Sequence, residues 1–340
     1  LESGCVSYVM QISQFGFLTQ LYYGKRIPRE DVSYVEKLYD RGSEAVVFGA
    51  PSRRYSPNVI TSEYPSYGKG DFRECAFIPR GADGARVFEG KVKGFEILQE
   101  KPTIPGMPSL YGEGETLVVT LEDEISKVQV DLYYSVYDEL DAIARRAVIK
   151  NNADTPLVLD RAYSFSLDLP AGSYKVITQY GAHMRERTPE VTPLMHGIMS
   201  VDSKRGATSL HSSCFMALAA KDADEESGDV YGFNLIYSGS FRLTAEQSPY
   251  DMVRVLGGIN DFDFSWKLLP GESFYTPEAA MVYSGKGLGA MSRTFHDLYR
   301  GYIINKRFVN AVRPIVINNW EATYFNFDIP KLCSIIDTVK

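Results

Sequence analysis

Alternating apolar and polar residues recur along most of this 340-residue chain and constrain its fold more than any other feature. Val128, Val130 and Leu132 alternate with polar neighbours, which is the period-two pattern of a strand with one buried face. Similar strand patterns return at 116–121, 164–169, 174–180, 215–219, 230–237 and 241–245. Turns rich in Gly, Pro and Asp separate these segments, so the sequence predicts an all-β antiparallel sandwich. Residues 5–285 are too many for one seven-stranded sandwich, and we expect a larger, many-stranded one.

The pattern changes near Gly285, where apolar residues begin to recur at helical spacing. One side of the predicted helix carries Leu288, Met291, Phe295 and Leu298. Charged and polar residues fill the other side, which is typical of a helix that packs on one face. We expect a helix that connects two domains.

The last part of the chain predicts a strand followed by a helix. Ile315–Ile317 is continuously apolar, as expected of a parallel strand buried on both faces. Asp328 can cap a helix that starts at Pro330. A parallel strand without neighbours leaves its backbone groups unpaired, and a (β/α)8 barrel needs about 250 residues. We therefore interpret the chain as the N-terminal part of a longer protein.

Composition excludes several classes of function. The balance of 36 Lys and Arg against 43 Asp and Glu gives a net charge of −7, without the basic face that nucleic-acid binding needs. No apolar run is long enough to predict a membrane span. The four cysteines lack metal-ligand or disulfide spacing, so we expect free thiols, no metal and a cytoplasmic protein.

Four segments, in order, give the chain a resemblance to a known family. They are YYGKRI at 22–27, EYPSYGKGDFR at 63–73, RER at 185–187 and NNWEATYFNF at 318–327. The ordered set resembles the N-terminal region of the retaining α-galactosidases of glycoside hydrolase family 36. Raffinose synthases and α-N-acetylgalactosaminidases are the nearest alternatives.

The resemblance implies an N-terminal β-supersandwich at residues 1–285, a helical linker at 286–312 and the first strand and helix of a (β/α)8 catalytic barrel at 313–340. It also implies hydrolysis of α-galactoside oligosaccharides such as melibiose and raffinose by a homotetramer, without metal or cofactor. Two aspartates about 5 Å apart would perform the double displacement. In the family both lie on later barrel strands, so we expect this fragment to be inactive by itself. A stand-alone sugar-binding or assembly module and a galactosyl-transferring relative remain the alternatives.

The chain departs from the family pattern at three places. Cys75 stands where the family suggests Pro, and His183 stands where many relatives carry Trp. Residues 41–55 read as an insertion or a divergent loop. These departures affect the expected sugar contacts more than the family assignment.

Trp320 is the first candidate substrate-binding residue. It follows the expected first barrel strand, at the end where barrel active sites form. A Trp ring can pack on the apolar face of galactose while its N–H binds a hydroxyl group. The alternative is an ordinary packed aromatic residue at a domain junction.

A Gly-rich loop supplies four further candidates, Tyr67, Asp71, Phe72 and Arg73. Arg and Asp side chains can both hydrogen-bond to paired sugar hydroxyls. The resemblance implies that this loop reaches the active site of a neighbouring subunit. The alternative is that Asp71 and Arg73 form a surface pair that only holds the loop.

His183, beside the RER segment, is the last candidate, since this segment lies near the active-site rim in relatives. A lone histidine could equally be an ordinary loop residue. Asp261 and Asp263 have the spacing of one strand face. We interpret them as exposed polar positions between buried Phe262 and Phe264, and not as a catalytic pair.

Overall fold

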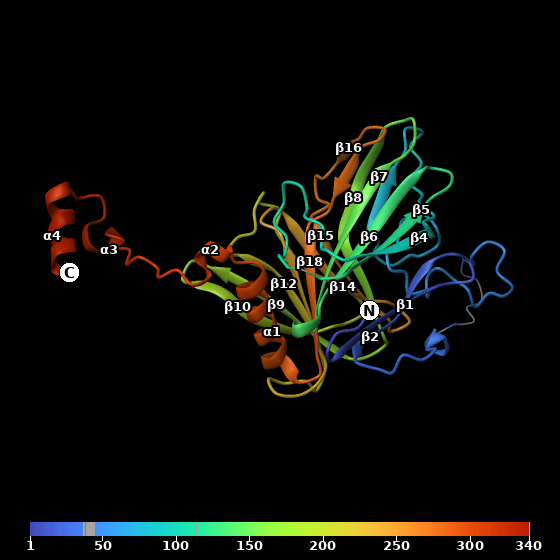
Figure 1. The fold of residues 1–340 in the computed structure, drawn as a ribbon, viewed down its shortest axis with the longest axis horizontal. Coiled ribbons are helices and arrows are strands. Elements are labelled where there is room, and N and C mark those ends of the chain that lie inside the picture. Colours follow the sequence, from blue (N-terminus) through green and yellow to red (C-terminus); the bar gives the residue numbers. More distant parts are fainter. Residues whose placement is uncertain (37, 39–44, 113, 340) are drawn as a thin grey trace. The chain divides into compact units, whose positions relative to one another are not determined.

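A computed structural model describes residues 1–36, 38, 45–112 and 114–339 of the chain. They form two compact units, Leu1–Ile303 and Ile304–Lys340, and each is described by itself. Within the expected insertion at 41–55, residues 41–44 lie outside the described residues. Figure 1 shows that strands are the predominant regular elements of the first unit.

A large sheet, ten-stranded over the described residues, dominates the first unit. Nine strands follow the order β10-β9-β12-β13-β18-β7-β6-β5-β4, and β17 pairs with β7; each pairs antiparallel with its neighbours. Their bounds are β4 (Lys91–Leu98), β5 (Thr116–Glu122), β6 (Val128–Tyr137), β7 (Ala142–Asn151), β9 (Tyr174–Ala182), β10 (Arg185–Pro193), β12 (Ser212–Ala220), β13 (Val230–Ile236), β17 (Ser273–Tyr275) and β18 (Glu278–Ser284).

A second antiparallel sheet runs β11-β14-β15-β8-β16, with β3 also paired to β8. Its strands are β3 (Phe77–Arg80), β8 (Leu157–Leu169), β11 (Gly197–Asp202), β14 (Phe241–Gln247), β15 (Val253–Ile259) and β16 (Trp266–Leu268). A two-stranded ribbon precedes both sheets, formed by β1 (Val6–Ile12) and β2 (Leu18–Lys25). Two short 3-10 turns are η1 (Ser33–Val35) and η2 (Asp138–Leu140).

The two sheets share one hydrophobic core. Phe165 of β8 stacks on Phe233 of β13, with 5.4 Å between ring centroids and 7° between ring planes. Inward-facing residues of β6 and β14, such as Val130 and Leu243, are fully buried in the same cluster. All the segments predicted from alternation coincide with strands, so the prediction of a large, mainly β antiparallel sandwich is confirmed.

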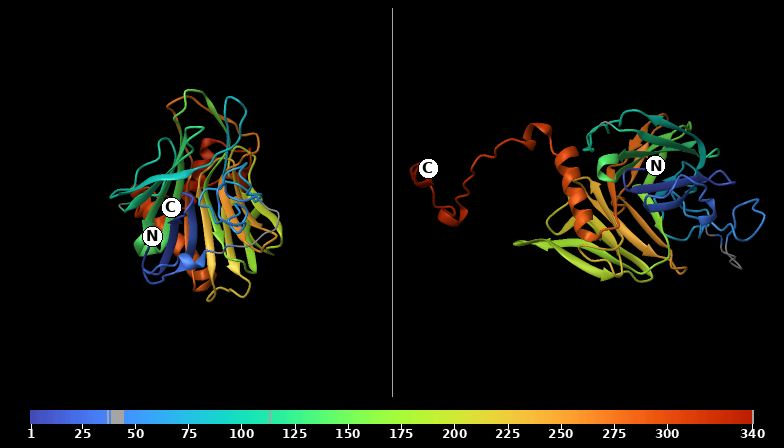
Figure 2. Two further views of the ribbon diagram at one scale, coloured as in Figure 1. Left: turned by 90° about the vertical axis from the view of Figure 1, so that its right-hand side faces the viewer. Right: turned by 60° about the horizontal axis from the view of Figure 1, so that its bottom comes forward.

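Helix α1 (Gly287–Tyr302) covers the outer face of the large sheet (Figure 2). Met291, Phe295 and Leu298 are buried there against small side chains such as Ala280. Gly232 of β13 permits this close approach, because a Cβ atom at this position would lie 2.6 Å from the Phe295 ring. The helical spacing predicted from the sequence is therefore confirmed.

The second unit contains α2 (Lys306–Val309), α3 (Trp320–Thr323) and α4 (Ile329–Val339). The predicted cap of α4 is confirmed, because Asp328 Oδ1 accepts a hydrogen bond of 2.9 Å from Lys331 N. The predicted strand at Ile315–Ile317 is wrong for this chain, since no regular element covers it and Ile315 is 94% exposed. A parallel strand needs a neighbouring strand for its backbone hydrogen bonds, and the described residues supply none here.

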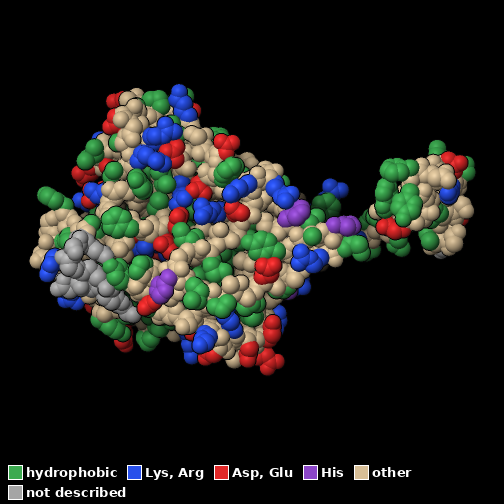
Figure 3. Space-filling model, turned by 180° about the vertical axis from the view of Figure 1, so that it is seen from behind, with side chains coloured by type: hydrophobic (Ala, Val, Ile, Leu, Met, Phe, Trp, Pro, Cys, Tyr) green, Lys and Arg blue, Asp and Glu red, His purple; other side chains and the backbone are tan. Residues whose placement is uncertain are grey.

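Surface features agree with the charge of the chain. Figure 3 shows Lys and Arg side chains interspersed with Asp and Glu over one face of the first unit, so this face carries no extended field of one sign. Cys5, Cys75, Cys214 and Cys333 are free thiols. Among the helices that the structure describes, none combines the length and the apolarity needed to cross a membrane.

Candidate functional site

The 63–73 loop begins at a buried charged cluster. Glu63 Oε1 accepts a hydrogen bond from Tyr8 Oη and Glu63 Oε2 accepts one from Tyr134 Oη, both at 2.6 Å. Arg145 Nη2 lies 2.8 Å from Glu63 Oε2, and all four side chains are buried. Burial raises the pKa of both tyrosines, so their hydroxyl groups stay protonated and donate to the carboxylate. This cluster fixes the start of the loop to β1, β6 and β7.

A second buried cluster fixes the end of the loop. Arg73 donates from Nε to Asp71 Oδ1 and from Nη2 to Asp71 Oδ2, both at 2.9 Å. Arg254 of β15 donates to Asp71 Oδ2 at 2.8 Å and forms two bonds of 2.7 and 2.8 Å with Asp168 of β8. The side chains of Asp71 and Arg73 are only 8% and 3% exposed. Asp71 and Arg73 therefore pair, as the alternative to sugar binding predicted, but the pair is internal and not at the surface.

These ion pairs keep the second cluster charged. Burial would raise the pKa of Asp71, but Arg254 and Arg73 outweigh it and hold that pKa below its ordinary value. Burial would likewise lower the pKa of Arg254, but Asp168 and Asp71 raise it. Both groups are consequently ionised at neutral pH, and the attraction between them offsets part of the desolvation cost of each.

The loop exposes the side chains of Tyr67 and Phe72, while those of Asp71 and Arg73 are buried. Phe72 is 77% exposed and Tyr67 is 52% exposed. The guanidinium of Arg86 lies 5.6 Å from the centre of the Tyr67 ring. Asn58 Oδ1 accepts a hydrogen bond of 3.1 Å from Phe72 N and so holds the backbone of the tip. Of the four residues predicted as a set, Tyr67 and Phe72 have exposed side chains, whereas those of Asp71 and Arg73 are buried.

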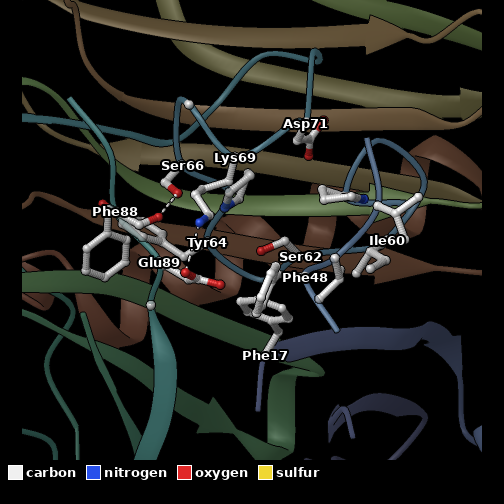
Figure 4. A pocket seen from close by; sticks show the side chains of 16 residues that line it. Phe17, Phe48, Ile60, Ser62, Tyr64, Ser66, Lys69, Asp71, Phe88 and Glu89 are labelled. Atoms are coloured by element: carbon white, nitrogen blue, oxygen red, sulfur yellow. Dashed lines mark hydrogen bonds and ion pairs between the residues drawn. The ribbon is translucent and has the colours of Figure 1, made fainter. Parts of the chain in front are cut away.

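A cavity of about 290 Å³ lies beside the loop (Figure 4). Aromatic side chains of Phe17, Phe48 and Phe88 line it. Its polar rim includes Lys69 and Glu89, whose Nζ and Oε2 atoms are 2.9 Å apart. The cavity thus combines apolar rings with one ion pair at the base of the exposed tip.

His183 lies elsewhere, in the turn between β9 and β10, and it is exposed. Figures 1 and 2 place this hairpin and the blue segment before β3 at opposite ends of the first unit. A groove of about 790 Å³ runs between the hairpin and α1, with Arg187, His296 and Tyr299 among its lining residues. One copy of the first unit therefore does not bring His183 together with Tyr67 and Phe72.

Trp320 belongs to the second unit, where it starts α3 and is 45% exposed. Its ring packs against Tyr324 and Phe325, with centroid distances of 5.4 and 4.9 Å. Asn318 Oδ1 accepts a hydrogen bond of 2.9 Å from Trp320 N. The indole is thus held locally by its own sequence neighbours while part of its surface stays open.

The interpretation of Asp261 as an exposed strand residue is wrong. Its side chain is 18% exposed, and its carboxylate accepts bonds of 2.9 Å from Arg161 Nε and 3.0 Å from Tyr163 Oη. Burial would raise the pKa of Asp261, but Arg161 outweighs it and lowers that pKa. Phe262 is 64% exposed, because residues 261–264 form a turn and no strand alternation applies.

Sequence reasoning missed the partners that anchor the loop, namely Arg145, Asp168 and Arg254. Asp168 occupies a polar position of the alternating segment 164–169, which we expected to face solvent. Both faces of this part of β8 are covered, so Ser164 and Ser166 are buried as well. An arginine or aspartate within an otherwise apolar strand was the available signal, since such a charge needs a partner when it is buried.

We expect the stability that Asp71 contributes to depend on acidity. Because its folded-state pKa is below the ordinary value of 3.8, the contribution is complete above that value and is lost as the pH falls through the folded-state pKa. Urea unfolding of the wild-type chain and of Asp71→Asn at pH 7, 5, 4 and 3 measures this. The wild type should be more stable at pH 7, and the difference should shrink below pH 4. A difference that stays the same at every pH would contradict this assignment.

The chain matches two family models of glycoside hydrolases. Residues 16–269 match the glycosyl hydrolase family 36 N-terminal domain, and residues 273–340 match the melibiase model. The first match covers most of the chain and includes both the loop and the hairpin. The chain belongs to glycoside hydrolase family 36.

Curated relatives include α-galactosidase AgaA of Geobacillus stearothermophilus, 41% identical over 99% of this chain and 47% of the relative. α-Galactosidase Mel36A of Lactobacillus acidophilus is 36% identical over 100% of this chain and 47% of its own length. A crystal structure of the Geobacillus enzyme in complex with raffinose matches with a TM-score of 0.96 and 40% identity, over 99% of this chain and 48% of that chain. This chain spans about half the length of these relatives.

Proposed function

We propose that this chain is the N-terminal part of a retaining α-galactosidase. The match to an enzyme solved with raffinose, over 99% of this chain at 40% identity, is the observation that carries the proposal. A related structure solved with stachyose supports the same class of substrate, α-galactoside oligosaccharides. Hydrolysis would proceed by double displacement between two carboxyl groups of the barrel, without metal or cofactor.

In this proposal the chain shapes the substrate rim. Tyr67 and Phe72 offer exposed aromatic faces, and such faces pack on the apolar side of a sugar ring. Trp320 offers a third exposed ring, and His183 a polar group at the hairpin turn. Asp71 and Arg73 hold the loop from inside, because they hydrogen-bond to one another and Asp71 also binds Arg254.

The rim requires more than one copy of the chain. The loop and the hairpin lie at opposite ends of one first unit (Figure 1), so a rim that contains both needs a second copy. A homo-oligomer, a tetramer by the family resemblance, meets that requirement. The domain boundaries after residues 285 and 312 belong to the same proposal.

The test is galactose release by the protein that continues this chain through a complete barrel. Release from nitrophenyl α-galactoside and from raffinose is expected, with retention of anomeric configuration. Lack of release from either substrate would refute the proposal. Product analysis with sucrose as acceptor separates a hydrolase from a galactosyl-transferring enzyme. Galactose binding by residues 1–340 in a protein without hydrolase activity would favour the sugar-binding module.

A further inference from the structure

Arg254 connects strand β15 to Asp71 and Glu74, at the end of the loop. It lies directly opposite Asp168 in the register of β15 and β8. The carboxylate of Asp168 accepts hydrogen bonds from Arg254 Nε and Nη2, at 2.7 and 2.8 Å. This bidentate pairing fixes the plane of the guanidinium relative to the sheet. The remaining nitrogen, Nη1, reaches Asp71 Oδ2 at 2.8 Å and the carbonyl oxygen of Glu74 at 3.1 Å.

Asp71 passes this constraint on to the rest of the loop. It binds Arg73, whose Nη2 also donates to the carbonyl oxygen of Ile60 at 2.7 Å. Phe72 lies between Asp71 and Arg73 in sequence, so its backbone is held on both sides by buried side chains. The direction in which the Phe72 ring leaves the protein therefore depends on a network that starts at Arg254.

Neither Arg254 nor Asp168 can touch a ligand. Both side chains are only 1% exposed, and Arg254 is bonded to Asp71 of the loop. Two arginines and two aspartates also exceed what is needed to close a short loop, since hydrophobic residues of similar volume commonly stabilise a core as well as a buried ion pair does. Directional hydrogen bonds between these charged side chains instead fix the orientation of the loop relative to the sheet.

We infer that Arg254, with Asp168, is a positioning residue that sets the orientation of Phe72 and thereby determines how well the enzyme binds the part of an oligosaccharide beyond its galactosyl unit. This inference rests on the proposed function. It assigns the selectivity for longer substrates to an ion pair inside the sandwich, acting through the loop.

The first measurement does not depend on enzymatic activity. Trypsin can cut after Lys69 and Arg73 only when the loop leaves its anchored conformation. In Arg254→Met, cleavage at these two bonds should be about tenfold faster than in the wild-type chain. Glu278→Gln is the matched control, because Glu278 forms a buried pair with Lys101 (2.8 Å, side chains 2% and 4% exposed) outside the loop. It should leave cleavage of the loop unchanged.

The second measurement uses the active protein that contains this chain. Arg254→Met should raise KM for raffinose about tenfold and leave kcat for nitrophenyl α-galactoside within about twofold, because a displaced loop affects binding of the distal sugars and not the chemistry. Arg254→Lys keeps the charge but not the fork, so its KM should fall between those of the wild type and Arg254→Met. On a Phe72→Ala background, the Arg254 substitution should add little further change, because its effect passes through that ring.

The outcomes separate the two proposals. Faster cleavage of the loop together with the raffinose-specific rise in KM supports the inference. Unchanged cleavage overturns it, as does faster cleavage with unchanged KM in both Arg254 variants. Additive effects on the Phe72→Ala background also overturn it, since they would show a route that bypasses the Phe72 ring. Absence of galactose release by the wild-type protein refutes the proposed function instead, and it does so independently of the cleavage result.

Discussion

Replacing Arg145 by alanine is expected to lower the free energy of unfolding by about 3–5 kcal/mol, which is a large fraction of the stability of an ordinary domain. The substitution leaves the Glu63 carboxylate buried without its cation, with only the hydroxyl groups of Tyr8 and Tyr134 to compensate. Equilibrium urea unfolding, followed by tyrosine fluorescence and circular dichroism, measures the change. The loss should be larger than that of any surface substitution in the same sheet.

Arg300→Ala provides the control for a surface ion pair. Arg300 pairs with Asp297 at 3.1 Å, and the two side chains are 67% and 59% exposed. An ion pair of this kind contributes at most about 1 kcal/mol. A loss below about 1 kcal/mol for Arg145→Ala would show that Glu63 finds another partner. The double variant Glu63→Gln/Arg145→Met should recover part of the loss, because it leaves no buried charge unpaired.

Residues 1–340 alone are expected to release galactose from nitrophenyl α-galactoside no faster than a buffer blank. A retaining hydrolase needs two accessible carboxyl groups, one of which carries a raised pKa. The close carboxylates of the described chain do not meet this need: Asp71 and Asp168 both bind Arg254, and Glu74 and Asp261 both bind Arg161. A chromogenic assay of the purified chain measures the release, with the protein continued through a complete barrel as the positive control.

Glu246 provides the critical check on that expectation. Burial raises the pKa of its carboxyl group, which makes it the best-tuned candidate acid among the described residues. Its Oε2 atom accepts a hydrogen bond of 2.6 Å from Glu74 N, which is a structural role. Galactose release by residues 1–340 that disappears in Glu246→Gln would overturn the expectation and place chemistry in the sandwich.

The sequence was informative wherever a pattern is local. Alternation located β5, β6, β8 and β9, because the two faces of a strand differ in burial whatever the strand pairs with. Helical spacing located α1 for a similar reason. The expected strand at Ile315–Ile317 did not form, because the stability of a parallel strand lies in neighbours that are distant in sequence.

Only part of the candidate site could be predicted from the sequence, for the same physical reason. The loop at 63–73 could be recognised from its own residues, but its anchors could not. Asp71 and Arg254 are 183 positions apart, and Glu63 and Arg145 are 82 apart. A charged residue in a buried strand indicates that it needs a partner of opposite charge, but the sequence of the chain does not identify that partner. Asp71 and Arg73 therefore read equally well as sugar ligands or as a holding pair.

The placement of the core within the chain has a consequence during synthesis on the ribosome. The buried hydrophobic residues of the sandwich, as far as the structure describes them, end at Leu298. The sandwich can therefore complete its folding once α1 has emerged from the ribosome, before the segments after α1 emerge. Ile315, Val316 and Phe325, each at least 80% exposed, would meanwhile remain unprotected. This short stretch is where we expect a chaperone to bind the nascent protein.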